Sequence, residues 1–201
     1  MLAVAHDGGN SDAQEGQRGE TLARKRVPKD WEELRNIGDL YDTFSKESDR
    51  GVAIVGAAYL DERLGDLLES FLIDDGKEVH RLLSASQFAP LGTFGAKTSA
   101  AYCLGLISKN EYEDLNGIRG IRNDFAHRQK DVSFTDADVG LKCDRLLLWR
   151  PLEDLLKPRS ARDIFQFTTS LLLSRLEMRA LRAAKHRRTA PKEFVLKEVV
   201  R

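Results

Sequence analysis

The chain has 201 residues, of which 32 are Lys or Arg and 32 are Asp or Glu, so its formal net charge at neutral pH is zero. A neutral chain creates no global field that attracts a polyanion, so contact with nucleic acid would need a local basic patch. The length is that of one domain of roughly 150 to 170 residues with tails.

Cysteine use and the apolar runs argue against secreted and membrane proteins. Cys103 and Cys143 fit neither a disulfide framework nor a CxxC metal motif, which predicts reduced and buried thiols. The longest apolar run, residues 51–60, is far shorter than the roughly 20 residues that a membrane span needs. The first ten residues also lack the basic start and the long apolar stretch of a signal peptide. We therefore expect a soluble cytoplasmic protein without membrane contact.

The N-terminal part divides into an arm and two helices. Residues 1–27 have too few apolar side chains to offset the entropy of ordering, which predicts a disordered arm. A first helix is expected from Pro28, because proline suits the first helical turn. Its apolar residues recur at helical spacing: Trp31, Leu34, Ile37, Leu40, Tyr41 and Phe44. The second helix, 49–73, has apolar side chains on several faces, which is typical of a central, enclosed helix.

The remaining chain shows helical periodicity interrupted by loop signals. Pro90, Gly92 and Gly95 mark a loop, and the spacing of Ser108 and Glu111 is that of a capping box. Five further helices are expected, over residues 77–85, 95–106, 108–126, about 133–149 and about 160–188. No segment alternates with period two. We therefore predict an all-α fold, a single bundle of about six to seven helices over residues 28–188, with a C-terminal tail at 189–201.

The capping-box helix carries Arg122 close to its apolar face. At about 100° per residue, Arg122 lies within about 20° of Leu115, and Arg119 within about 40°. A guanidinium in this position is costly to bury unless an acid pairs with it. Asp61 lies about 60° from Leu64 on the second helix. We expect Asp61 to form a structural ion pair with Arg122 or Arg119.

Residues 90–136 contain, in order, the segments PLGTFGAK, YCLGLIS, EYEDL, FAH and SFTD. Together with the preceding GAAYLDERLGDLLESFL, they resemble the central segment of the mannitol operon repressor (MltR or MtlR) family. The resemblance covers roughly residues 45–150, extends more weakly to the last helix and does not reach the arm. It implies an all-helical regulatory protein, named for transcriptional repression but without a recognised DNA-binding module, which acts through protein partners.

A second, local resemblance concerns Arg122, Asn123 and His127. Their spacing resembles the Arg-polar-x-x-x-His motif of HEPN domains, which are helical bundles and often dimers. In the nuclease branch of that superfamily, the Arg and His cleave RNA without a metal. The chemistry is sensible, since ribonuclease action needs a group that titrates near neutral pH and a fixed cation beside the phosphate. The resemblance therefore implies a metal-independent endoribonuclease, for example a toxin, as the alternative function.

The same three residues also have a structural interpretation, which we prefer because ion-pair networks perturb charged groups as well. In that interpretation Arg122 pairs with Asp61, Asn123 closes exposed backbone groups, and His127 caps the helix C-terminus, where the dipole favours a positive charge. Ribonuclease action needs His127 to transfer a proton, whereas the structural interpretation needs it only to cap the helix. The sequence leaves both interpretations open.

Direct recognition of DNA is not expected. Ala101 and Gly105 have the spacing of a helix-turn-helix, but Glu111 and Asp114 occupy positions that should be buried in its second helix. Two acids there would break the packing and repel phosphates. One basic cluster could bind a polyanion or an acidic partner, although a solvated helix end explains it equally simply. It consists of Arg175, Arg179, Arg182, Lys185, Arg187 and Arg188.

No metal or cofactor site is predicted. His6, His80 and His186 are scattered without ligand spacing, and neither a phosphate-binding loop nor a nucleophile elbow is present. The resemblance to the MltR family therefore implies a non-enzymatic regulator, a repressor of carbohydrate metabolism of the mannitol type, that works through a protein partner. A homodimer is an open alternative. RNA is the expected partner only if the ribonuclease alternative holds.

Overall fold

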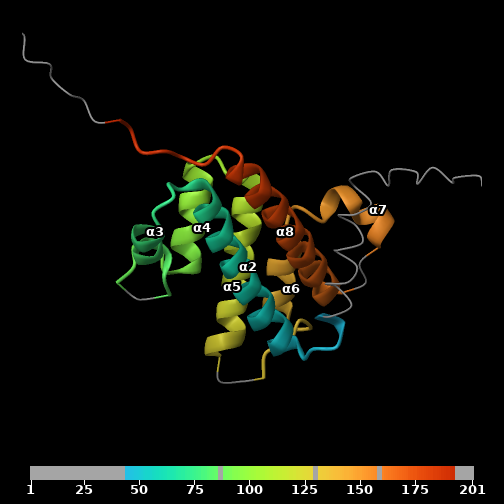
Figure 1. Cartoon of the computed structure of the whole chain (residues 1–201). Helices are drawn as coiled ribbons and strands as arrows, with labels where there is room; N and C mark the ends of the chain where they lie inside the picture. The colour runs from blue at the N-terminus through green and yellow to red at the C-terminus, as the bar shows by residue number, and fades with distance from the viewer. Residues whose placement is uncertain (1–43, 86–87, 129–130, 158–159, 193–201) are drawn as a thin grey trace, which may run out of the picture.

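The computed structural model describes residues 44–85, 88–128, 131–157 and 160–192. These residues form helices and no strand, which confirms the all-α prediction (Figure 1). The elements are α2 (Asp49–Phe71), α3 (Gly76–Leu83), α4 (Phe94–Cys103), α5 (Lys109–His127), α6 (Ala137–Asp144), a 3-10 turn η1 (Arg150–Leu152), α7 (Glu153–Leu156) and α8 (Ala161–Ala184). The predicted arm, most of the predicted first helix and the end of the predicted tail lie outside the described residues.

Short polar side chains define where the longer helices begin. In each case an oxygen accepts a hydrogen bond from the backbone N–H three residues later, which pairs one of the free amides of the first turn. The caps are Ser48 for α2, Asp75 for α3, Thr93 for α4, Ser108 for α5 and Ser160 for α8. At Ser108 the predicted capping box is complete, because the Glu111 side chain also accepts from the Ser108 backbone N–H.

The second helix is central, as its apolar pattern predicts. α2 packs most extensively against α8 and then against α5 and α4, while α3 and α7 lie at opposite edges of the bundle (Figure 1). Gly56 allows the close approach of α8, because a Cβ there would lie 3.1 Å from the Thr169 methyl carbon and 3.7 Å from the Phe165 ring. The most enclosed helix is nevertheless α8, in which every residue from Ile164 to Ser174 is buried.

The predicted helix over about 133–149 is wrong at both ends, because α6 covers only Ala137–Asp144. Beyond α6, two backbone N–H groups donate to a side chain of another helix and not to a carbonyl of their own helix. Those of Leu147 and Leu148 donate to the two carboxylate oxygens of Asp114 on α5, at 2.7 and 2.9 Å. A helix running through these residues would need the same N–H groups for its own hydrogen bonds. The buried Asp114 side chain therefore competes with continuation of α6.

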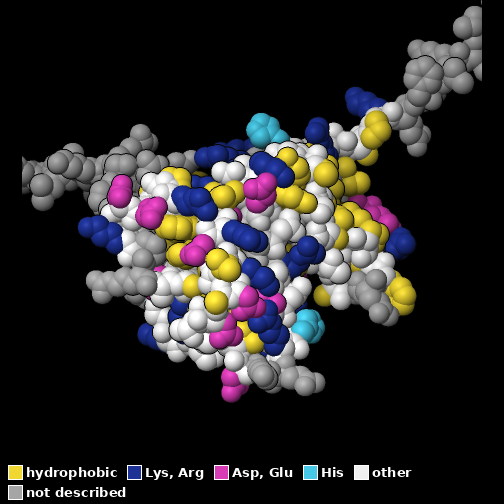
Figure 2. All heavy atoms as spheres, turned by 180° about the vertical axis from the view of Figure 1, so that it is seen from behind, with side chains coloured by type: hydrophobic (Ala, Val, Ile, Leu, Met, Phe, Trp, Pro, Cys, Tyr) yellow, Lys and Arg dark blue, Asp and Glu magenta, His cyan; other side chains and the backbone are white. Residues whose placement is uncertain are grey.

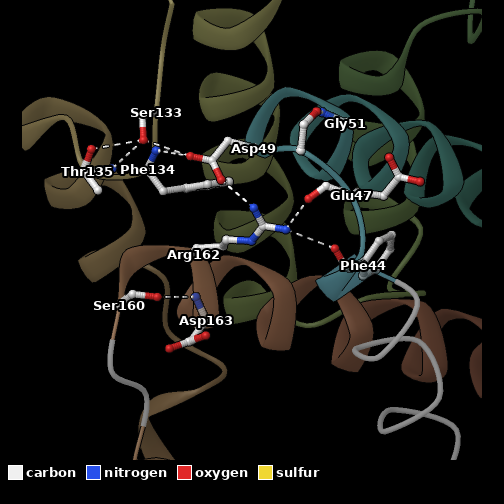
Figure 3. A network of polar contacts seen from close by, with 11 residues as sticks. Phe44, Glu47, Asp49, Gly51, Ser133, Phe134, Thr135, Ser160, Arg162 and Asp163 are labelled. Atoms are coloured by element: carbon white, nitrogen blue, oxygen red, sulfur yellow. Dashed lines mark hydrogen bonds and ion pairs between the residues drawn. The ribbon is translucent and has the colours of Figure 1, made fainter.

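A polar junction joins the starts of α2 and α8 to the segment before α6 (Figure 3). The Asp49 carboxylate accepts from the Ser133 hydroxyl at 2.8 Å, from the Phe134 backbone N–H at 3.1 Å and from Arg162 at 2.6 Å. Arg162 also donates to the carbonyl of Phe44 at 3.2 Å. Burial alone would raise the pKa of Asp49, but these hydrogen bonds and the arginine charge hold it below its ordinary value.

Candidate functional site

The last turns of α5 present the Arg122, Asn123 and His127 side chains. Arg122 is half-buried, whereas Asn123 and His127 are exposed. Among the described residues, none of the three has a hydrogen-bond or ion-pair partner. The helix end is closed by the Arg128 N–H, which donates to the Asp124 carbonyl at 3.1 Å. The fold therefore does not use these three side chains in the way that the structural interpretation requires.

The spacing of Arg122 and His127 separates the two side chains. Five residues along an α-helix correspond to a rotation of about 140° and a rise of about 7.5 Å. The two groups therefore leave α5 in different directions. This geometry disfavours a catalytic pair formed within one chain, although it leaves each group accessible by itself.

Asp61 is paired with Lys97 of α4 and not with Arg122 or Arg119. Lys97 Nζ lies 3.0 Å from Asp61 Oδ1, and only 8% of the lysine side chain is exposed. The buried face of α5 consists of Glu111, Asp114, Leu115, Ile118, Ile121 and Phe125. Its centre lies about 70° from Leu115, so Arg119 falls outside the buried face. Arg122 lies about 50° from that centre, within the span of the face, but the acid expected for it is already bound to Lys97.

Arg119 is exposed and lies against Gly95 at the start of α4. A Cβ atom on Gly95 would be 2.2 Å from Arg119 Nη1 and 3.1 Å from its Cζ. The absence of a side chain at Gly95 therefore leaves the space that the guanidinium occupies. In the part of the chain that the structure describes, Arg119 has no hydrogen-bond or ion-pair partner. The Arg119 guanidinium is therefore positioned by packing against Gly95, and it forms no hydrogen bond to a described residue.

Glu111 and Asp114 are both buried, with 0% and 1% of the residue exposed. The expectation that two acids at these positions would break the packing is therefore wrong. Asp114 binds the two backbone N–H groups described above, and Glu111 pairs with Arg179 of α8 at 2.8 Å. The turn also has the expected geometry, since Gly105 has a φ of 70°. Packing therefore gives no argument against the motif, and its absence stays a prediction.

The basic cluster at the end of α8 is partly structural. Arg179 pairs with Glu111 and donates to the Leu106 carbonyl at 3.2 Å. Arg187 pairs with Asp74 at 3.1 Å, and the Arg188 guanidinium lies 4.9 Å from the centre of the Phe71 ring. The fold therefore uses half of the predicted patch.

The other half of that cluster, Arg175, Arg182 and Lys185, has no hydrogen-bond or ion-pair partner among the described residues. The exposed residues Glu177 and Leu181 lie between Arg175 and Arg182 in the sequence of α8. On the face of the molecule seen from behind, Lys and Arg side chains are likewise interspersed with acidic and apolar ones (Figure 2). The cations on this surface are therefore separated from one another. Binding of a polyanion would need a continuous row of neighbouring Lys and Arg side chains.

Neither thiols nor acidic clusters form a chemical centre in the described part of the chain. No group of three or more His, Cys, Asp or Glu there could hold a metal ion. Cys143 is buried as predicted, and burial raises its pKa to about 12. Cys103 is exposed, which corrects the prediction that both cysteines are buried. No described helix has the length and apolarity to cross a bilayer.

The contact between Arg119 and Gly95 is the feature that sequence reasoning missed. The sequence predicts a loop at Pro90, Gly92 and Gly95, and an ion pair of Asp61 with Arg122 or Arg119. A usable signal was present, because a glycine inside a helix lowers helix stability and often marks a close approach of another group. Gly95 is the second residue of α4. The partner of that glycine could not be read from the sequence, since it lies on another helix.

The fold is similar to that of a chain in a solved structure, the X-ray structure of the MtlR–HPr complex from Escherichia coli. The match has a TM-score of 0.55 and 20% sequence identity, and it covers 72% of this chain and 97% of the matched chain. No family model matches this sequence, and no curated protein matches it. At this level of identity, the likeness supports an MtlR-like fold and leaves the function to be argued separately.

Proposed function

We propose that this chain is a regulatory protein of the MtlR type, which acts by binding a protein partner of the HPr type. The observation that carries the proposal is the likeness in fold to a chain of the MtlR–HPr complex. The match covers 97% of that chain and 72% of this one. The resemblance of the segments PLGTFGAK, YCLGLIS and EYEDL to the MltR family stays an expectation from the sequence, since no family model matches the chain. In the proposed role, the chain controls genes of carbohydrate uptake of the mannitol type and responds to the state of its partner.

The direct test is isothermal titration of the full chain with HPr from its own organism, and with Escherichia coli HPr as a second probe. We expect saturable one-to-one binding with a Kd on the order of micromolar, which is about −8 kcal/mol. Lysozyme serves as a control for non-specific attraction. Absence of binding to both HPr proteins at about 100 µM would refute the partner assignment. A companion measurement compares transcripts of polyol-uptake genes with and without the chain.

The ribonuclease alternative is supported by the unpartnered state of Arg122, Asn123 and His127. Purified protein would then cleave single-stranded RNA in EDTA, and His127→Ala would lower the rate by about 10² to 10⁴ while the protein stays folded. The divergence of Arg122 and His127 on α5 disfavours this function for a single chain. Cleavage that is lost in both Arg122→Ala and His127→Ala would establish it in place of the regulatory role.

A further inference from the structure

The exposed side of α5 combines polar groups that the fold leaves unused. Arg122 and Asn123 follow Arg119 by three and four residues, so each is its neighbour on the next turn of the helix. His127 neighbours Asn123 on the following turn and lies about 140° around the helix from Arg122. We call these four residues the α5 polar surface. In the described part of the chain, none of the four has a hydrogen-bond or ion-pair partner.

The two arginines make this surface electrostatically incomplete. Like charges on adjacent turns of a helix repel each other, and this normally favours an intervening acid. The nearest acid in sequence, Asp124, already forms ion pairs with Arg128 and Lys142. Arg122 is moreover half-buried and has no hydrogen-bond partner among the described residues. An external anion between the arginines would relieve the repulsion and give Arg122 a partner.

The contact with Gly95 fixes the position of Arg119 on the α5 polar surface. An exposed arginine normally loses much rotamer entropy when it binds a ligand, but packing against a neighbouring helix reduces that loss. Because Arg119 occupies the space in which a Gly95 side chain would lie, the guanidinium is already positioned on the α4–α5 surface. A planar, positioned guanidinium is suited to a carboxylate, which it binds through two parallel hydrogen bonds.

We infer that the α5 polar surface, with Arg119 seated on Gly95, is where this protein binds an acidic face of its protein partner. This inference rests on the proposed function, for which it names the surface and the chemistry of recognition. An acidic protein fits better than a nucleic acid for two reasons. The net charge of the chain is zero, and an interface to nucleic acid commonly uses about 6 to 10 phosphate contacts, more than this surface provides.

The test compares variants of the full chain in titrations against three probes: HPr, a peptide of ten glutamates, and single-stranded oligouridine. Arg119→Ala and Arg122→Ala should each weaken binding of HPr and of the peptide by about tenfold or more, as is typical of arginine hot spots. The matched control is Arg182→Ala on α8, which removes an exposed arginine that also lacks a partner among the described residues. It should change neither affinity by more than about twofold.

Gly95→Ala separates binding from stability. The added methyl group collides only with the end of the flexible Arg119 side chain, so the fold can accept it by moving the guanidinium. Alanine also stabilises a helix relative to glycine. We therefore expect an unchanged or higher Tm together with affinity for the acidic probes that is lower by several-fold. A lower affinity accompanied by a lower Tm would contradict this reasoning.

The possible results test the inferred surface and the HPr assignment separately. If HPr binds and neither Arg119→Ala nor Arg122→Ala weakens it, the inferred surface is wrong and the proposed function stands. If HPr does not bind but the glutamate peptide binds in an Arg119-dependent way, the surface stands and the HPr assignment fails. Equal losses in Arg182→Ala, or tighter Arg119-dependent binding of oligouridine than of the acidic probes, would overturn the inference.

Discussion

Replacing Arg179 by Ala should destabilise the fold much more than replacing any other arginine of the α8 cluster. Arg179 Nε and Nη2 reach the Glu111 carboxylate at 3.0 and 2.8 Å. The glutamate side chain is 1% exposed, whereas that of Arg179 is 32% exposed. Without the guanidinium, a buried carboxylate keeps only the hydrogen bond from the Ser108 N–H, at 2.6 Å. The substitution therefore leaves a buried charge without a counterion.

Breaking a buried ion pair on one side commonly costs about 3 to 5 kcal/mol. Because Arg179 is partly exposed, water can enter the space that it vacates, so we expect the lower end, about 3 kcal/mol. For a domain of this size, that loss corresponds to a Tm lower by about 6 to 12 °C. Urea unfolding followed by circular dichroism measures the free energy, and calorimetry measures the Tm.

The control is Arg182→Ala, which should change stability by less than about 0.5 kcal/mol because no described residue pairs with Arg182. Adding Glu111→Gln to Arg179→Ala removes the buried charge but keeps an oxygen for the Ser108 N–H. The double variant should then cost less than the sum of the two single changes, by about 1 kcal/mol or more. Equal effects of Arg179→Ala and Arg182→Ala, or strict additivity of the double variant, would refute the argument.

Three other predictions follow from the contacts of acids and thiols. Burial alone would raise the pKa of Asp49, but its hydrogen bonds and Arg162 outweigh burial, so the net shift is downward. The stabilisation from Asp49 should be complete above about pH 5 and be lost as the pH falls through its folded pKa. Asp49→Asn should therefore flatten the acid limb of stability measured by urea unfolding. A thiol reagent at pH 8 should modify Cys103 quickly and Cys143 only after unfolding, because burial raises the Cys143 pKa to about 12; fast reaction of two thiols in the native protein would contradict the burial. Asp114→Ala should cost about 2 to 4 kcal/mol in urea unfolding, because it leaves two backbone N–H groups without their acceptor; a loss below about 1 kcal/mol would show that water replaces the carboxylate.

Local signals were sufficient for the starts of the longest helices, but the short α7 (Glu153–Leu156) was not predicted. The starts of α2, α5 and α8 follow from Ser48, Ser108 and Ser160, because capping involves residues only three positions apart. Apolar periodicity also identified α2 as central, since a helix that is apolar on several faces must be covered on them. The early end of α6 could not be predicted in this way, because it depends on an acid that lies 33 residues earlier in the chain.

For the candidate site, the sequence determined which residues could act, and the tertiary structure decided which of them are already used. Arg122, Asn123 and His127 stood out from their spacing, and their positions on α5 follow from helix geometry alone. Whether an arginine is paired depends on side chains from other helices, and these meet only when the bundle forms. The acid expected for Arg122 is bound to Lys97, Arg179 of the predicted patch is bound to Glu111, and Arg119 lies on Gly95. The physical reason is that an ion pair needs two groups within about 4 Å, and periodicity along one helix gives direction but no distance to the next.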